Sequence, residues 1–117
     1  GKSDFAHRLA CCIGGTIINC DSVQIYRGIE AIAASPFAGR DSFDEIDGIP
    51  YRLFSILPLT EQISVSDYLR LARTAYDDAI SAGRTPIFVT DGYFTPSTTV
   101  TEAYTPNSAT QKSFKKN

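Results

Sequence analysis

The sequence has no apolar run long enough to cross a membrane, since a helical span needs about 20 consecutive apolar residues. It also has no excess of basic residues. Its formal net charge is −2, so binding to nucleic acid would need a local basic patch. The first helical turns carry Lys2, Asp4, His7 and Arg8, which interrupt the apolar segment that a signal peptide requires. We therefore expect no membrane partner and a cytoplasmic location.

Cysteine is scarce and lacks the spacing of a metal site. The chain has three cysteines, Cys11, Cys12 and Cys20, which is an odd number. Cys11 and Cys12 are neighbours, which rarely bridge, and Cys20 closes an apolar run. We expect all three to be reduced thiols that serve as small apolar residues.

What is present is the composition of a soluble domain. The chain has 117 residues, of which 43% are hydrophobic, enough for one domain with a modest core. Residues 3–12 predict a short helix with Phe5, Leu9 and Cys12 on one face, ended by two glycines. The β-branched run Thr16–Cys20 predicts a buried strand.

The rest of the chain alternates between the same two kinds of element. Residues 22–50 carry repeated Gly and Pro and predict loops with short helical pieces. Tyr51–Leu57 predicts a second strand and Pro86–Val89 a third. We therefore expect an α/β fold with a parallel sheet and flanking helices.

The helix after Ile63 has the clearest signals. Ser64 as N-cap and Asp67 resemble a capping box, Ile63 can pack on Tyr68, and Gly83 supplies the stop. An apolar stripe at helical spacing predicts its buried face: Val65, Tyr68, Leu69, Ala72, Tyr76, Ala79 and Ile80.

The composition changes after Val89. Residues 90–117 are rich in Thr, Ser, Pro, Asn and Lys and show no period of two or of 3.6. Such a segment buries too little apolar surface to offset its ordering entropy. We therefore divide the chain into a folded domain over residues 1–89 and a low-complexity, disordered tail over residues 90–117.

Two features predict a reaction centre. Gly1-Lys2-Ser3 are the last three letters of a phosphate-binding loop, in which the lysine supplies positive charge and the Ser3 hydroxyl can hold Mg²⁺. A helix that starts at Ser3 and a strand that returns to Asp21 place this acid beside Lys2 and Ser3, at the edge where open α/β sheets bind ligands. By itself Gly1–Ser3 is also compatible with a chance N-terminus, and Asp21 with a strand-end turn.

The order of residues in this part of the chain resembles a known family. G-K-S at residues 1–3, L-A at 9–10 and G-G-x-I-I-x-x-D-S-x-Q-x-Y-R-G over residues 14–28 are similar to the start of tRNA dimethylallyltransferases, the tRNA isopentenyltransferase family. The similarity continues through Ile49–Leu57, Ser64–Tyr68 and Gly83–Val89. The resemblance implies a P-loop NTPase-like sheet that lacks its first strand and its C-terminal part.

The resemblance also implies a reaction and its partners. The family transfers a dimethylallyl group from dimethylallyl diphosphate to N6 of the adenine beside a tRNA anticodon. Gly1, Lys2 and Ser3 would bind the diphosphate with Mg²⁺, Asp21 would be the general base, and Asp21, Ser22, Val23 and Gln24 would contact the anticodon stem-loop. The adenine would leave its stack of bases to enter the site. The resemblance also implies a monomeric enzyme.

Three departures qualify this expectation. The family continues G-G-T-G-x-Y where this chain reads Thr90-Asp91-Gly92-Tyr93-Phe94-Thr95, and Ala33–Pro36 lacks the lysine of the family's T-A-K-P. The residues before Gly1 that complete a phosphate loop are absent from this sequence. We therefore expect an inactive fragment of such an enzyme. The alternatives are a P-loop small-molecule or nucleotide kinase, and a non-functional remnant.

Overall fold

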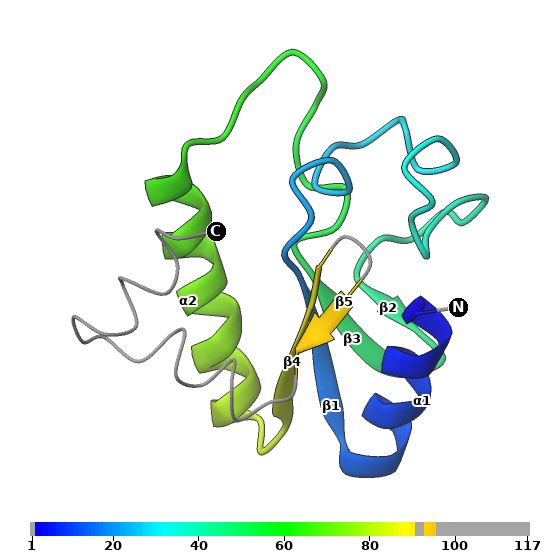
Figure 1. The fold of residues 1–117 in the computed structure, drawn as a ribbon. Helices are drawn as coiled ribbons and strands as arrows, with labels where there is room; N and C mark the ends of the chain where they lie inside the picture. The colour runs from blue at the N-terminus through cyan, green and yellow to red at the C-terminus, as the bar shows by residue number, and fades with distance from the viewer. Residues whose placement is uncertain (1, 91–92, 96–117) are drawn as a thin grey trace.

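The computed structural model describes residues 2–90 and 93–95 of the chain. Within these ranges two helices, α1 (Lys2–Ile13) and α2 (Val65–Ser81), flank one five-stranded sheet (Figure 1). Its strands, in chain order, are β1 (Gly15–Asn19), β2 (Glu45–Ile46), β3 (Ile49–Arg52), β4 (Thr85–Thr90) and β5 (Tyr93–Thr95). Their spatial order is β2-β3-β1-β4-β5.

The centre of the sheet is parallel and its edges are antiparallel. Strand β1 pairs in parallel with β3 and with β4, as the alternation of elements predicts. Strands β2 and β5 pair antiparallel with β3 and β4, so the sheet is mixed rather than purely parallel. The β2–β3 hairpin turns at Asp47 and Gly48, which both have positive φ as a tight two-residue hairpin requires. An Asp-Gly pair is the sequence signal for this hairpin.

The predicted second strand is displaced. It was expected over Tyr51–Leu57, but β3 covers Ile49–Arg52 and ends there. Leu53 and Ser55 have φ angles of 68° and 53°, in the left-handed region, so the chain cannot continue extended through them. Strand β5 lies inside the segment expected to have no regular structure, whereas residues 96–117 of that segment lie outside the described residues.

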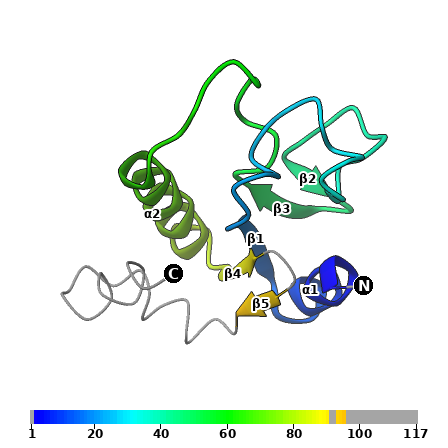
Figure 2. The ribbon, with the colours of Figure 1, turned by 45° about the horizontal axis from the view of Figure 1, so that its top comes forward.

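The two helices cover opposite faces of the sheet, which Figure 2 shows from one end. Ile17 packs in one core cluster with the alanines of α1 and with Phe37, Tyr51 and Phe54. Ile18 points the other way and packs in a second cluster with the alanines of α2 and with Phe88. The alternation of neighbouring residues across a strand therefore assigns one helix to each side of β1.

Helix α1 forms where expected but buries a different face. Ala6 and Ala10 are buried and Leu9 packs against the same core cluster, while Phe5 is 52% exposed and Cys12 is exposed, so the predicted apolar face is right at Leu9 and wrong at Phe5 and Cys12. The reason is close packing. A Cβ at Gly15 would lie 3.1 Å from the Ala10 Cα and 2.5 Å from the Ile87 Cδ1, so helix and sheet approach through their smallest residues.

Helix α2 confirms its predicted ends. The Ser64 side chain accepts a hydrogen bond from the Asp67 N–H at 3.1 Å, and Gly83, with φ +73°, follows the C-cap residue. The predicted stripe is right at its centre, where Ala72 and Ala79 are buried. It is wrong at its ends, because Val65 and Ile80 are 73% and 52% exposed.

The cysteines are free, as expected, although only Cys20 packs against a core cluster, while Cys11 and Cys12 are exposed. Neither α1 nor α2 has the length and apolar character of a membrane-crossing helix, and no other helix occurs in residues 2–90 and 93–95.

Candidate active site at the end of strand β1

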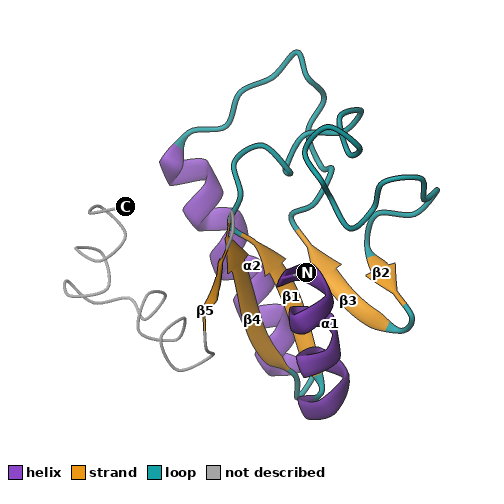
Figure 3. Cartoon of the chain, turned by 45° about the vertical axis from the view of Figure 1, so that its right-hand side comes forward, coloured by secondary structure: helices purple, strands orange, loops and turns teal. Residues whose placement is uncertain are grey.

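The loops that follow β1 and β3 gather at one end of the sheet, drawn uppermost in Figure 3. Helix α1 begins at the same end, since β1 runs back in the direction opposite to α1 (Figure 1). Lys2 and Ser3 are the first two residues of α1, and Asp21 lies two residues beyond the last residue of β1. This is the topological relationship that the sequence predicts. Gly1 lies outside the described residues.

The strand end is fixed by Asn19, a residue that the sequence reading did not select. Asn19 is fully buried, and its side-chain oxygen accepts a hydrogen bond from the Asp21 N–H at 2.7 Å. Its amide nitrogen donates to the carbonyls of Asp21 and Leu53, each at 2.9 Å. One side chain therefore joins the ends of β1 and β3. A polar residue inside an apolar strand was the available signal.

Asp21 closes a tight turn at this edge. Its Oδ1 accepts a hydrogen bond from the Val23 N–H at 2.8 Å, which orients the carboxylate. Its Oδ2 has no partner among the hydrogen bonds and ion pairs of the described residues. Asp21 is intermediate in exposure. The residue thus offers one oxygen atom to a ligand while the other holds the backbone.

Helix α2 contributes a second support. The Tyr68 hydroxyl donates to the Asn19 carbonyl at 2.7 Å and lies 3.1 Å from the Cys20 sulfur. The Cys20 N–H donates to the Val89 carbonyl at 2.7 Å. Tyr68 was expected to be a core residue. It packs against the second core cluster, and its polar end additionally fixes the residues directly before Asp21.

The predicted tRNA-contacting residues differ in how free they are. Ser22 is exposed and Val23 is 48% exposed, so both face solvent beside Asp21. The Gln24 amide nitrogen donates to the carbonyls of Ala33 and Ala34, at 2.9 and 3.3 Å. Both of its N–H groups are thereby used inside the loop. In this conformation Gln24 has only its side-chain oxygen left for a base edge.

The far end of this loop is tied to Ser55. Arg27 donates through Nε to the Ser55 carbonyl at 3.1 Å, and its guanidinium lies 5.0 Å from the centre of the Phe43 ring. The Ser55 hydroxyl donates to Glu30 Oε2 at 2.6 Å, and this bond lowers the pKa of the Glu30 carboxyl. Neither Ser55 nor Glu30 was selected from the sequence, because no local pattern joins residues so far apart.

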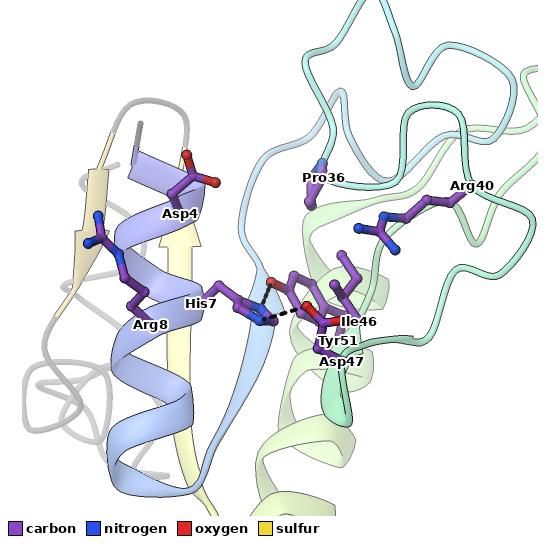
Figure 4. Close-up of a pocket in the computed structure, with 8 residues that line it drawn as sticks. All are labelled: Asp4, His7, Arg8, Pro36, Arg40, Ile46, Asp47 and Tyr51. Carbon is purple, nitrogen blue, oxygen red and sulfur yellow. Dashed lines mark hydrogen bonds and ion pairs between the residues drawn. The ribbon is translucent and has the colours of Figure 1, made fainter.

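A separate pocket lies between α1 and the segment that leads into the β2–β3 hairpin (Figure 4). It has a volume of about 280 Å³ and is lined by Asp4, His7, Arg8, Pro36, Arg40, Ile46, Asp47 and Tyr51. His7 Nδ1 lies 2.7 Å from the Tyr51 hydroxyl, and His7 Nε2 lies 3.6 Å from an Asp47 carboxylate oxygen. Burial raises the pKa of Tyr51 to about 12. These contacts attach the hairpin to α1.

No group of three or more His, Cys, Asp or Glu side chains in the described part of the chain could hold a metal ion. Mg²⁺ commonly takes only one or two protein ligands, with water and substrate phosphates completing its shell. The expected site at Ser3 is of that kind, and it stays a prediction.

Comparison with known proteins gives one consistent answer. The model of the IPP transferase family matches residues 24–114. The tRNA dimethylallyltransferases of Streptomyces griseus and Salinispora arenicola are 44% and 42% identical to this chain over 89 residues, which are 76% of the chain. The same alignments cover 27% and 25% of those proteins, so the chain spans about a quarter of the length of these relatives.

Solved structures agree with the sequence comparison. The full-length tRNA isopentenylpyrophosphate transferase from Bacillus halodurans superposes with a TM-score of 0.67 at 33% identity, over 77% of this chain and 28% of its own. A eukaryotic dimethylallyltransferase that acts on tRNA gives a TM-score of 0.66 at 28% identity, over 77% of this chain and 21% of its own. The α/β architecture is therefore that of one part of these transferases, and the chain belongs to the IPP transferase family.

Proposed function

We propose that this chain carries the acceptor-activating edge of a tRNA dimethylallyltransferase, with Asp21 as the general base. In this reaction the N6 amine of an adenine attacks the first carbon of dimethylallyl diphosphate. The N6–carbon bond forms, the carbon–oxygen bond to diphosphate breaks, and the amine proton passes to Asp21. The observation that carries the proposal is the carboxylate of Asp21, in which one oxygen is fixed by the Val23 N–H and the other is unpartnered within the described residues.

The neighbouring residues have distinct parts in the proposal. Ser22 and Val23, which are exposed, would contact the anticodon loop, and the Gln24 side-chain oxygen would accept a hydrogen bond from a base. Gly1, Lys2 and Ser3 would bind the diphosphate leaving group, whose growing negative charge a lysine stabilises. Mg²⁺, when bound with the Ser3 hydroxyl among its ligands, would neutralise part of the same charge.

The chain alone is proposed to lack transferase activity, because it spans about a quarter of its relatives. Incubation with dimethylallyl diphosphate, Mg²⁺ and an anticodon stem-loop should yield no modified adenosine by mass spectrometry. Product above the rate of a protein-free control would contradict this part of the proposal.

The role of Asp21 can be tested by binding. We expect an anticodon stem-loop to perturb the amide NMR signals of residues 21–24, and a stem-loop with inosine in place of the acceptor adenosine to perturb them less. Asp21→Asn keeps an oxygen for the Val23 N–H but adds an N–H donor, so it should abolish the preference for adenosine. Equal binding of both RNAs by the unaltered chain would refute the proposed role. Binding of free nucleotide without RNA would favour a kinase, and binding of neither would favour a remnant.

A further inference from the structure

We propose that Ser55 and Glu30 are positioning residues that hold the Ser22–Gln24 turn in the conformation that presents it to RNA. The inference rests on the function proposed above for that turn. It concerns residues that touch neither Asp21 nor the proposed ligands, and that act through the backbone of the loop between them.

Ser55 contacts this loop with every polar group that it has. Its N–H donates to the Gln24 carbonyl at 3.0 Å, and its carbonyl accepts from Arg27 Nε at 3.1 Å. Its hydroxyl donates to Glu30 Oε2 at 2.6 Å. These three bonds reach three different points of the segment between residues 24 and 30. The three bonds converge on one fully buried serine, and its hydroxyl is the group that reaches a charged side chain.

The backbone at Ser55 is in an unfavourable conformation. Its φ of 53° lies in the left-handed region, where a residue with a Cβ is strained unless its surroundings hold it. This conformation directs the N–H and the carbonyl of Ser55 toward the loop. The strained φ angle and the hydrogen bonds to the loop therefore occur together. Strain of this kind is typical of sites where a backbone is preorganised for function.

Glu30 completes the attachment. Both of its carboxylate oxygens lie 3.1 Å from the Gly28 N–H, and one of them also accepts from Ser55. The carboxylate therefore links the end of the D-S-x-Q-x-Y-R-G segment to the residues after β3. Within the described residues, Arg27 is the charged side chain that further lowers the pKa of Glu30.

The loop is thus held on both sides of the exposed residues Ser22 and Val23. Asn19 fixes its start through Asp21, and Ser55 fixes its end, both through contacts with the segment Leu53–Ser55. The exposed residues Ser22 and Val23 lie between the two attachments. A turn fixed at both ends loses little conformational entropy when it binds, which is the advantage of preorganisation.

Amide hydrogen exchange, measured residue by residue by NMR on the full chain, tests the proposal. Ser55→Ala removes the hydroxyl bond and keeps both backbone bonds, and Glu30→Gln weakens the same link without shortening the side chain. Both variants should accelerate exchange across residues 22–28 by about tenfold, with the amides of Ala72–Ala79 in α2 unchanged. Ser42→Ala is the matched control, because it removes another serine–carboxylate bond, that of Ser42 to Asp44 at 2.8 Å.

The pH dependence of amide protection is a second test, because a purely structural role of these residues would not make protection follow the titration of Glu30. Protection factors of residues 22–28 in the unaltered chain should fall as the pH drops through the titration of Glu30, whereas those of Glu30→Gln should not follow that titration. Unchanged exchange in both variants would overturn the proposal. So would equal acceleration in α2, which would indicate a loss of global stability.

The two proposals fail in different ways. If the variants loosen residues 22–28 but the unaltered chain binds no stem-loop RNA, the positioning role stands and the proposed function fails. If the unaltered chain binds RNA and neither variant alters exchange or RNA affinity, the proposed function stands and the positioning role is refuted. Support for both requires the loosened variants to bind the stem-loop about tenfold more weakly than the Ser42→Ala control.

Discussion

The middle and the carboxyl end of strand β1 are held by different kinds of interaction. Its middle is buried by apolar residues from both faces, with Ile17 in one cluster and Ile18 in the other. Its carboxyl end is held by the Asn19 side chain, which bonds to backbone groups of Asp21 and Leu53, and the loop beyond it is held by the backbone and side-chain hydrogen bonds of Ser55. Apolar packing builds the platform, and directional hydrogen bonds place the residues that would touch a ligand.

This difference predicts that damage to the platform lowers global stability most. Phe37 is fully buried and contacts three aromatic rings, those of Phe43, Tyr51 and Phe54, at 5.3–5.9 Å between centroids. Phe37→Ala should reduce the free energy of unfolding by about 3–5 kcal/mol in urea denaturation. Phe5→Ala, at a position 52% exposed, is the matched control and should cost less than about 1 kcal/mol. Equal losses would contradict the assignment of the core.

The polar end should be the next most sensitive. Asn19→Ala removes three hydrogen bonds and leaves the Leu53 carbonyl without its side-chain donor. We expect a loss of about 3 kcal/mol, comparable to a core substitution although little apolar surface changes. Gln62→Ala, at an exposed loop position, should be neutral. A loss below about 1 kcal/mol for Asn19→Ala would mean that the strand end is held by packing after all.

A loss of stability at alkaline pH is expected from Tyr51, which lines the pocket beside α1. Burial raises the pKa of Tyr51 from 10 to about 12, so the folded state keeps a proton that the unfolded state releases. Stability from this group is therefore complete below about pH 10 and is lost as the pH rises toward 12. We expect a decline of about 2 kcal/mol over that interval.

The measurement is urea denaturation between pH 9 and 12 as the pH is raised in steps, with Tyr51→Phe as the reference. That variant lacks the titrating hydroxyl and should show a flatter dependence, although it also loses the bond to His7. Parallel pH profiles for the two proteins would show that Tyr51 is not the group responsible.

The contrast between local packing and distant hydrogen bonds also explains which elements of the fold the sequence predicts. Helix α2 and strands β1 and β4 follow local rules, such as the Ser64 cap and the β-branched run at Thr16–Ile18, so they were predicted within one or two residues. The end of β3 was not, because it depends on positive φ at Leu53 and Ser55. That conformation is held by hydrogen bonds to residues that lie much earlier in the chain. A local sequence pattern cannot predict such contacts.

The candidate site divides in the same way. The placement of Asp21 at the edge where α1 begins follows from topology, and the sequence predicts it. The supports of that edge do not follow, because Asn19, Tyr68 and Ser55 donate hydrogen bonds to backbone carbonyls of residues far away in the chain, those of Leu53, Asn19 and Gln24. The burial of Ala6 in place of Phe5 has a similar origin: the helix packs by its smallest residues because Gly15 permits a close approach, and hydrophobicity alone does not reveal this.

The smallest expected effect concerns the N-cap of α2, which belongs to the locally determined part of the molecule. The Ser64 hydroxyl accepts a hydrogen bond from the Asp67 N–H. This N–H is one of the backbone donors in the first turn that have no partner within the helix. Ser64→Ala should lower the free energy of unfolding by about 1 kcal/mol. Ser66→Ala is the control, since Ser66 is exposed inside the first turn. Because Tyr68 follows Ser64 by four residues and bonds the Asn19 carbonyl, fraying at this cap should also speed amide exchange at Cys20 and Asp21. If exchange there is unchanged while α2 frays, the helix start and the strand end are independent, and the polar edge is held by Asn19 and Ser55 without help from α2.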